Sequence, residues 1–140
     1  MADWKWFALA SAVFAGLTAV LSKVGVRNVP SSWATLFRTF VVLVFLSGLV
    51  WARHEWRNPS SLAGRSLLFL ALSGLATGFS WLCYYRALQT GPASLVAPLD
   101  KLSLLFAVLL SVFFLGERLG PAQWLGVGMM TGGALMVALR

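Results

Sequence analysis

The chain alternates between long apolar runs and short polar segments. A transmembrane helix needs roughly 20 mostly apolar residues to cross about 30 Å of hydrocarbon, and the runs are about this long. Segments rich in Pro, Gly, Ser and charged residues separate them. The pattern predicts an all-α integral membrane protein, a five-transmembrane-helix bundle in a single domain over residues 1–140. The predicted spans cover residues 4–21, 33–52, 66–88, 94–115 and 121–139.

The first run is expected to remain in the protein as a span. It carries Asp3 near its front, and the segment from Leu21 to Val24 lacks the small-x-small pattern of a signal-peptide cleavage site. Small residues recur every four positions in three spans, as Ala8, Ala12 and Gly16, as Gly74 and Gly78, and as Gly128 and Gly132. Such positions let helices approach closely in lipid and predict a tight bundle, although glycine is also simply common in membrane helices.

Composition agrees with a membrane protein and argues against an enzyme. Apolar residues make up 59% and charged residues 11% of the chain, whereas soluble domains average about 45–50% and ~25%. One Cys excludes an intrachain disulfide, and one His with four acids leaves little for metal or hydrolytic chemistry. We therefore expect no catalytic residues, no metal and no cofactor. The net charge of +7 comes from isolated basic residues that form no patch, so no nucleic-acid partner is expected.

Charge outside the spans gives almost no orientation signal. Five crossings divide these cations into five on the N-terminal side and four on the other side. They are Lys5, Arg53, Arg57, Arg65 and Arg118, against Lys23, Arg27, Arg86 and Arg140. The positive-inside rule works through a difference in these counts. Either a weak bias fixes one orientation, or the chain inserts both ways and forms an antiparallel homodimer of ten helices, similar to the inverted repeats of secondary transporters.

Three ionisable residues lie inside predicted spans. Arg38 is about six residues into the second span, and Asp100 and Lys101 are about six into the fourth, which places each about 9 Å below the same membrane surface. Lys23 and Arg86 cap the first and third spans on that side. A charge near the bilayer centre costs ~2.5–3.5 kcal/mol and usually faces a cavity or a partner. All five residues are therefore candidate substrate-binding residues.

Other arrangements of these charges remain open. Asp100 and Lys101 are neighbours, roughly 100° apart on a helix, so we expect them to neutralise each other poorly and Asp100 to pair with Arg38 or Lys23. Alternatively, Arg38 and Lys101 extend toward the membrane surface, and Lys23 and Arg86 are interfacial anchors.

Two further features of the spans point toward a site. Trp81 and Tyr85 share one helix face and suit a pocket wall, although such rings also form the aromatic belt of membrane proteins. Pro98 lies three residues before Lys101. It either kinks the fourth span or occupies its first turn.

The second half of the chain carries a recognisable order of motifs. YYRALQTGPASLVAPLDKLS from Tyr84, followed by FLGERLGPAQWLGVGMMTGGAL, resembles the EamA family of the drug/metabolite transporter superfamily. Lys23-x-Gly25, Pro30 and Arg38 fit the front of the same unit. The resemblance implies a short, single-unit form that assembles from two copies. It also implies export or exchange of small metabolites, often amino acids, across the bacterial inner membrane, and a stabilising role for the turn around Glu117.

These features lead to one functional expectation and two alternatives. We expect a multi-pass secondary transporter of amino-acid-like, anionic or zwitterionic compounds, working by alternating access. Arg38 and Lys101 would attract a carboxylate or phosphate group, while Asp100 would bind an amine, carry a proton or hold a basic partner. The alternatives are translocation of a lipid or lipid-linked carrier, and a non-transport accessory membrane subunit. The expected partners are a small-molecule substrate, the lipid bilayer and a second copy.

Overall fold

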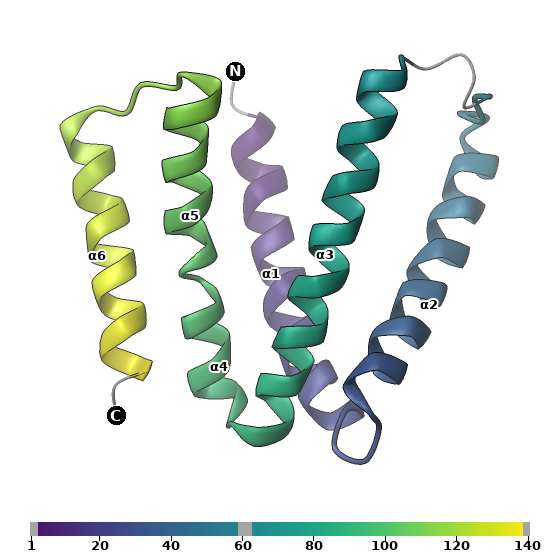
Figure 1. Ribbon diagram of the computed structural model, residues 1–140, viewed down its shortest axis with the longest axis horizontal. Helices are drawn as coiled ribbons and strands as arrows, with labels where there is room; N and C mark the ends of the chain where they lie inside the picture. Colours follow the sequence, from purple (N-terminus) through teal and green to yellow (C-terminus); the bar gives the residue numbers. More distant parts are fainter. Residues whose placement is uncertain (1–2, 59–62, 139–140) are drawn as a thin grey trace. The chain divides into compact units, whose positions relative to one another are not determined.

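The computed structural model describes residues 3–58 and 63–138, and these are almost entirely helical (Figure 1). This confirms the all-α prediction, and no strand occurs in the described ranges. The elements are α1 (Asp3–Gly25), α2 (Ser31–Ala52), α3 (Gly64–Thr90), α4 (Ala93–Asp100), α5 (Ser103–Leu110), the π-helix η2 (Ser111–Leu115) and α6 (Pro121–Ala138).

Four helical stretches are long and apolar enough to cross a membrane, namely Trp4–Gly25, Ser31–Ala52, Gly64–Thr90 and Ala93–Leu115. The last of these combines α4, α5 and η2. Large apolar side chains are exposed on every long helix, as on a surface that lipid or another subunit covers. The chain is a multi-pass membrane protein. Helix α6 contains a proline, a glutamine and four glycines among its 18 residues, which lower its hydropathy, so the fifth crossing stays a prediction.

The chain divides into two compact units. Unit 2 is the continuous segment Ser22–Gln89, which holds the last turn of α1 together with α2 and α3. Unit 1 comprises the described residues of Met1–Leu21 and Thr90–Arg140, and it includes α4 through α6. Each unit therefore has its own site and its own helix ends, which can be compared.

Helix α2 has a well-defined start and end. It follows Pro30, whose carbonyl accepts the first helical hydrogen bond, from the N–H of Ala34 at 2.9 Å. At its end, His54 adopts a left-handed conformation with φ of 55°. The N–H of His54 donates to the Trp51 carbonyl and that of Glu55 to the Val50 carbonyl, both at 3.1 Å. This is the Schellman pattern that satisfies the last carbonyls of a helix.

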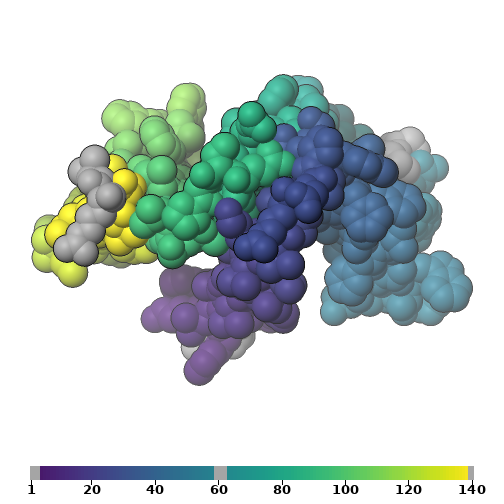
Figure 2. Space-filling view, turned by 90° about the horizontal axis from the view of Figure 1, so that it is seen from below, coloured from purple at the N-terminus to yellow at the C-terminus, as the bar shows by residue number. Residues whose placement is uncertain are grey.

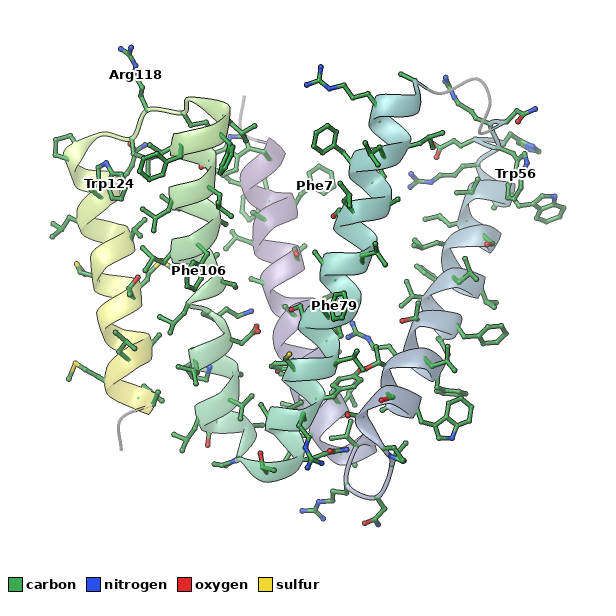
Figure 3. The ribbon with its side chains drawn as sticks, in the orientation of Figure 1. Phe7, Trp56, Phe79, Phe106, Arg118 and Trp124 are labelled. Atoms are coloured by element: carbon green, nitrogen blue, oxygen red, sulfur yellow. The ribbon has the colours of Figure 1, made fainter. Side chains whose placement is uncertain are left out.

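Beyond these ends lie the loops. Figure 3 shows Trp56 just after the end of α2 and Arg118 pointing away from the loop between η2 and α6. Trp56 is exposed, in keeping with a loop position. Helix η2 ends at Gly116, which has φ of 69°, the left-handed conformation that glycine adopts without a steric cost.

The helix of the fourth predicted span is interrupted. Pro98 is the sixth residue of α4, so it lies beyond the first turn and provides no N–H for the Ser94 carbonyl. Farther along, the N–H groups of Lys101, Leu102 and Leu104 each donate to the carbonyl three residues back, at 3.0 Å. The expected loosening after the proline is confirmed, and the first-turn alternative is wrong. The break between α4 and α5 falls at Lys101 and Leu102.

The small-residue stripes do not pack within either unit. A Cβ added to any of the glycines in these stripes would meet nothing within 4 Å; they are Gly16, Gly74, Gly78, Gly128 and Gly132. The prediction that these positions pull the helices of one chain together is therefore wrong inside each unit. They occupy open helix faces instead.

Candidate functional site

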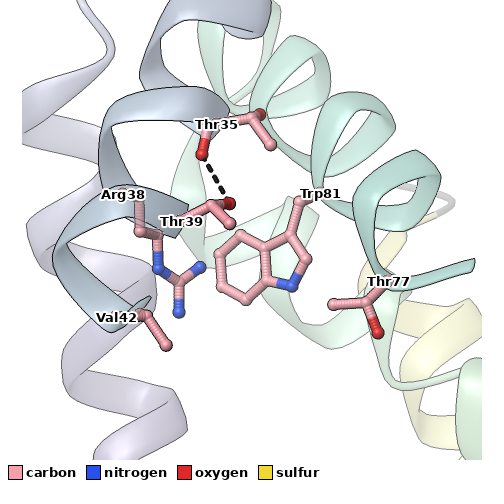
Figure 4. A pocket seen from close by; sticks show the side chains of 6 residues that line it. All are labelled: Thr35, Arg38, Thr39, Val42, Thr77 and Trp81. Carbon is pink, nitrogen blue, oxygen red and sulfur yellow. Dashed lines mark hydrogen bonds between the residues drawn. The ribbon is translucent and has the colours of Figure 1, made fainter. Parts of the chain in front are cut away.

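An open groove of about 190 Å³ lies between α2 and α3, inside unit 2 (Figure 4). Helix α2 contributes four residues and α3 two to its wall. They are Thr35, Arg38, Thr39 and Val42, with Thr77 and Trp81. The volume is below the roughly 300–1,000 Å³ of sites that enclose a drug-sized ligand. A groove of this size suits a small ligand or one end of a larger one.

The Arg38 guanidinium lies over the groove's aromatic wall. Its Cζ is 3.1 Å from the centre of the Trp81 ring, and such stacking gains from the negative face of the ring. No hydrogen bond or ion pair joins Arg38 to the described part of the chain, and its Nη1 is buried without a partner. A guanidinium carries five N–H donors, so this cation is held in place with its hydrogen-bonding capacity unused.

The groove face of α2 follows from helical spacing. Residues 35, 38, 39 and 42 lie at intervals of three and four and so share one face. Thr35 and Thr39 donate their hydroxyls to the carbonyls four residues back, at 2.8 Å. Thr77 does the same on α3, at 2.8 Å. The sequence analysis did not single out Val42 or these threonines, although their spacing from Arg38 and Trp81 was the available signal.

Tyr85 lies behind the groove and does not line it. Its side chain is only 3% exposed, and its ring packs edge-on to Trp81, with centroids 5.4 Å apart and planes at 81°. Its hydroxyl accepts a hydrogen bond from the Ser22 hydroxyl at 3.4 Å. Tyr85 therefore supports the ring on which Arg38 lies.

Lys23 and Arg86 lie outside the groove as well. The Lys23 ammonium donates to the backbone carbonyl of Leu88, in the last turn of α3. A cation there satisfies a terminal carbonyl and complements the helix dipole. Arg86 donates to Gln89 Oε1 at 3.3 Å, and Gln89 Nε2 donates to the Val29 carbonyl at 2.7 Å.

These contacts connect the α1–α2 loop to the end of α3. Figure 2 shows the dark blue loop against the teal end of α3. Leu88, in the last turn of α3, is completely buried. We call the Lys23–Leu88 and Gln89–Val29 contacts the loop tie, because they fix this end of unit 2.

Asp100 and Lys101 form a pair of their own in unit 1. Lys101 Nζ lies 3.7 Å from Asp100 Oδ2, so the expectation that these neighbours fail to pair is corrected. The helix ends at Asp100, and the flexible lysine side chain extends back from the turn that follows. Their side chains are 37% and 54% exposed, respectively. At this distance the contact is electrostatic and not a hydrogen bond.

The two units differ in formal charge. Unit 2 contains seven Lys and Arg residues and one acid, Glu55. Glu55 follows the end of α2, so α2 and α3 contain no carboxylate. Neither of the two helices that form the groove therefore supplies an anionic partner for Arg38.

Comparison with known proteins places the chain in a family. The family model described as "EamA-like transporter family" matches residues 4–139. The chain belongs to the EamA-like transporter family. This membership and the names of its relatives indicate a transporter.

The EamA relatives fall into short and long proteins. A Sinorhizobium protein named "Uncharacterized transporter in cobO 3'region" is 53% identical over 137 residues, which are 98% of this chain and 97% of the relative. A Bacillus subtilis protein named "Uncharacterized transporter YwfM" is 32% identical over 92% of this chain but only 43% of its own length.

A third relative is named for a substrate. It is the probable 4-amino-4-deoxy-L-arabinose-phosphoundecaprenol flippase subunit ArnE of Hamiltonella defensa, 28% identical over 73% of this chain and 93% of its own length. No solved structure matches the chain significantly.

Proposed function

We propose that this EamA-family protein is a secondary transporter of small anionic or zwitterionic metabolites in the bacterial inner membrane. The observation that carries the proposal is Arg38, a cation in a membrane-spanning helix whose donors are unused and which lines an open groove. Ionisable residues at such depth usually line a substrate or ion path. A carboxylate or phosphate supplies the negative charge that α2 and α3 lack.

The pair of Asp100 and Lys101 has a second role in this proposal. It lies at the interruption between α4 and α5, and interrupted helices expose backbone groups toward substrate in many transporters. Because the pair is partly exposed and 3.7 Å apart, substrate can replace either partner at small cost. Lys101 would bind the anionic group during part of the cycle, and Asp100 would bind an amine or carry a proton.

Two copies of opposite orientation would complete the transporter. The cations outside the spans are balanced, five against four, which fits insertion in both directions. The alignment covers less than half of YwfM, which fits a long relative that holds two repeats of this chain's length. If each five-helix repeat crosses the membrane an odd number of times, two repeats in tandem have opposite orientations, as in many secondary transporters.

Transport is tested in liposomes that contain only the purified chain. The assay measures exchange of labelled amino acids, dicarboxylates and sugar phosphates, with an organic cation as the control substrate. We expect flux of at least one zwitterion or anion, and loss of that flux in Arg38→Ala. Flux of the cation alone would contradict the charge class, and the absence of all flux would favour an accessory subunit.

Orientation is tested with an impermeant thiol reagent on intact cells. Single cysteines replace Asn28 or Trp56, which lie in loops at opposite ends of α2, in a Cys83→Ala background. We expect both positions to label in a fraction of the molecules. Labelling of one position only would exclude an inverted homodimer and direct the search to an oppositely oriented partner.

A second candidate function is translocation of a lipid or lipid-linked carrier. The similarity to ArnE, whose name describes a flippase subunit for a lipid-linked sugar, specifically favours it. The two functions differ in what competes with transport. Long-chain amphiphiles with an anionic head group would inhibit a flippase, whereas free amino acids and sugar phosphates would inhibit a metabolite transporter.

A further inference from the structure

We propose that the groove between α2 and α3 recognises an oxyanion that carries a neighbouring hydrogen-bond donor, such as an ammonium group. The inference deepens the proposed function and rests on it in taking the groove as the substrate's path. A free zwitterionic metabolite and a zwitterionic lipid head group share this chemistry. Three features of unit 2 support this ligand class, namely one cation, three hydroxyls and one aromatic wall.

The cation selects an oxyanion. The Arg38 guanidinium is planar, and its N–H donors match the oxygens of a carboxylate or phosphate. Its Cζ lies over the Trp81 ring, 3.1 Å from the ring centre, and this contact restrains the position of the donors. Because no described residue accepts a hydrogen bond from Arg38, an incoming oxyanion displaces no internal partner.

The hydroxyls select a donor beside that oxyanion. Thr35, Thr39 and Thr77 each donate their proton to a carbonyl of their own helix, at 2.8 Å. A hydroxyl has one proton and two lone pairs, so each of these oxygens is left mainly as an acceptor. Thr35 and Thr39 flank Arg38 on the same face of α2 (Figure 4). A purely anionic ligand would place its oxygens against these acceptors, whereas an ammonium or hydroxyl group would donate to them.

The groove excludes a simple organic cation. Neither α2 nor α3 contains a carboxylate, and Arg38 repels positive charge at short range. The apolar remainder of the wall, Val42 and the Trp81 ring, suits the carbon atoms of a small ligand or the glycerol region of a lipid.

The test uses three probes that separate the charges. Phosphoethanolamine carries both groups, inorganic phosphate only the anion, and ethanolamine only the ammonium. Binding to the purified full chain in a neutral maltoside detergent is measured by calorimetry. We expect phosphoethanolamine to bind about tenfold more tightly than phosphate, as one charge-assisted hydrogen bond predicts, and ethanolamine not to bind. Equal binding of phosphoethanolamine and ethanolamine, or no binding of any probe, would overturn the proposal.

Matched variants assign the binding to the groove. Arg38→Ala is expected to abolish binding of both phosphate probes. Arg65→Ala is the control, since Arg65 also faces an aromatic ring, that of Phe69 at 5.9 Å, but lies at the exposed start of α3. Replacement of Thr35 and Thr39 by valine keeps their shape, and is expected to reduce phosphoethanolamine affinity to that of phosphate. Phosphate binding that survives in Arg38→Ala would place the site elsewhere.

Competition by short-chain lipids distinguishes the two sources of the ligand. Phosphatidylethanolamine has N–H donors next to its phosphate, whereas phosphatidylcholine has the same phosphate and no N–H donor. If the ligand is a lipid, short-chain phosphatidylethanolamine displaces bound phosphoethanolamine and short-chain phosphatidylcholine does so much less well. If the ligand is soluble, neither lipid competes.

The binding results can be separated from those of the flux assay. If phosphoethanolamine binding requires Arg38 but flux is normal in Arg38→Ala, the binding site is supported and its role in transport is contradicted. If flux requires Arg38 but no oxyanion probe binds, the proposed ligand class is contradicted and the transporter function is supported.

Discussion

In unit 2, Arg38 lies against Trp81 with its donors unused, whereas in unit 1 Asp100 and Lys101 lie 3.7 Å apart at a helix break. Both sites begin from the same kind of sequence feature, an ionisable residue about two turns into an apolar helix. The surroundings make the difference. Helix α2 is continuous and faces an aromatic ring, and it offers Arg38 no acid. Helix α4 ends at Asp100, and Asp100 and Lys101 pair with each other. The unpaired Arg38 can bind an anionic ligand directly, whereas the ion pair of Asp100 and Lys101 must first separate.

The largest expected effect is that of removing the unpaired cation. We predict that Arg38→Ala lowers flux by roughly 10- to 100-fold, because a hydrogen bond to a charged group contributes about 1.5–3 kcal/mol and 1.36 kcal/mol is tenfold. Initial rates in liposomes, normalised to the amount of inserted protein, measure the effect. Arg65→Ala should stay within about twofold of the wild type. Similar rates in the two variants would mean that Arg38 is only an anchor.

The next largest effect is expected at Gln89, which forms a part-buried hydrogen bond to the backbone in unit 2, in contrast to the exposed bond of Gln123 in unit 1. Gln89→Leu should lower the free energy of unfolding by about 1–2 kcal/mol, because the Val29 carbonyl loses a 2.7 Å bond in a part-buried place. Gln123, whose side chain accepts from the Gly120 N–H at the exposed start of α6, is the control.

Gln123→Leu should cost less than about 1 kcal/mol, because water can replace an exposed bond. Thermal unfolding in detergent, followed by circular dichroism, measures both variants. An equal loss would show that the loop tie is no stronger than an ordinary exposed cap.

The pair in unit 1 should show weak coupling. A double-mutant cycle of Asp100→Asn and Lys101→Met is expected to give less than about 1 kcal/mol, since the two groups are partly exposed. Unfolding of the four proteins in one detergent measures the coupling. A value above about 3 kcal/mol would identify a desolvated structural pair and would remove it from the transport mechanism.

The smallest expected effect comes from the two left-handed helix ends. His54 in unit 2 and Gly116 in unit 1 have φ of 55° and 69°, but only glycine adopts this conformation without a steric cost. His54→Gly should raise the free energy of unfolding by up to about 1 kcal/mol, and Gly116→Ala should lower it by a similar amount. Unfolding midpoints that move in the same direction would contradict this account. Flux should not change in His54→Gly.

The sequence was sufficient to predict the helices but not the pairing of the charges. Helices appear as apolar runs because the length needed to cross lipid is fixed, and the weakness after Pro98 followed from its missing N–H. The partner of a long side chain depends on its rotamer, which periodicity does not show. Asp100 and Lys101 lie 3.7 Å apart, although neighbouring positions of a helix are roughly 100° apart.

The groove was only partly predictable, for a related reason. Arg38 and Trp81 were named as separate candidates, but nothing in the pattern showed that they face each other across two helices. Thr35 and Thr39 were not among the predicted site residues, and threonines in a membrane helix commonly donate back to their own backbone. Here they do so, and both residues also line the groove.

The division into units also has a consequence for the order of synthesis. Unit 2 is one uninterrupted stretch of chain, whereas unit 1 is built from both ends. Chains emerge from the N-terminus at about 5–20 residues per second, so Arg38, Trp81 and the loop tie are all made before α5 and α6 exist. A nascent chain arrested just beyond Thr90 already contains every residue of the groove, while the first residues of α1 still await the rest of their unit.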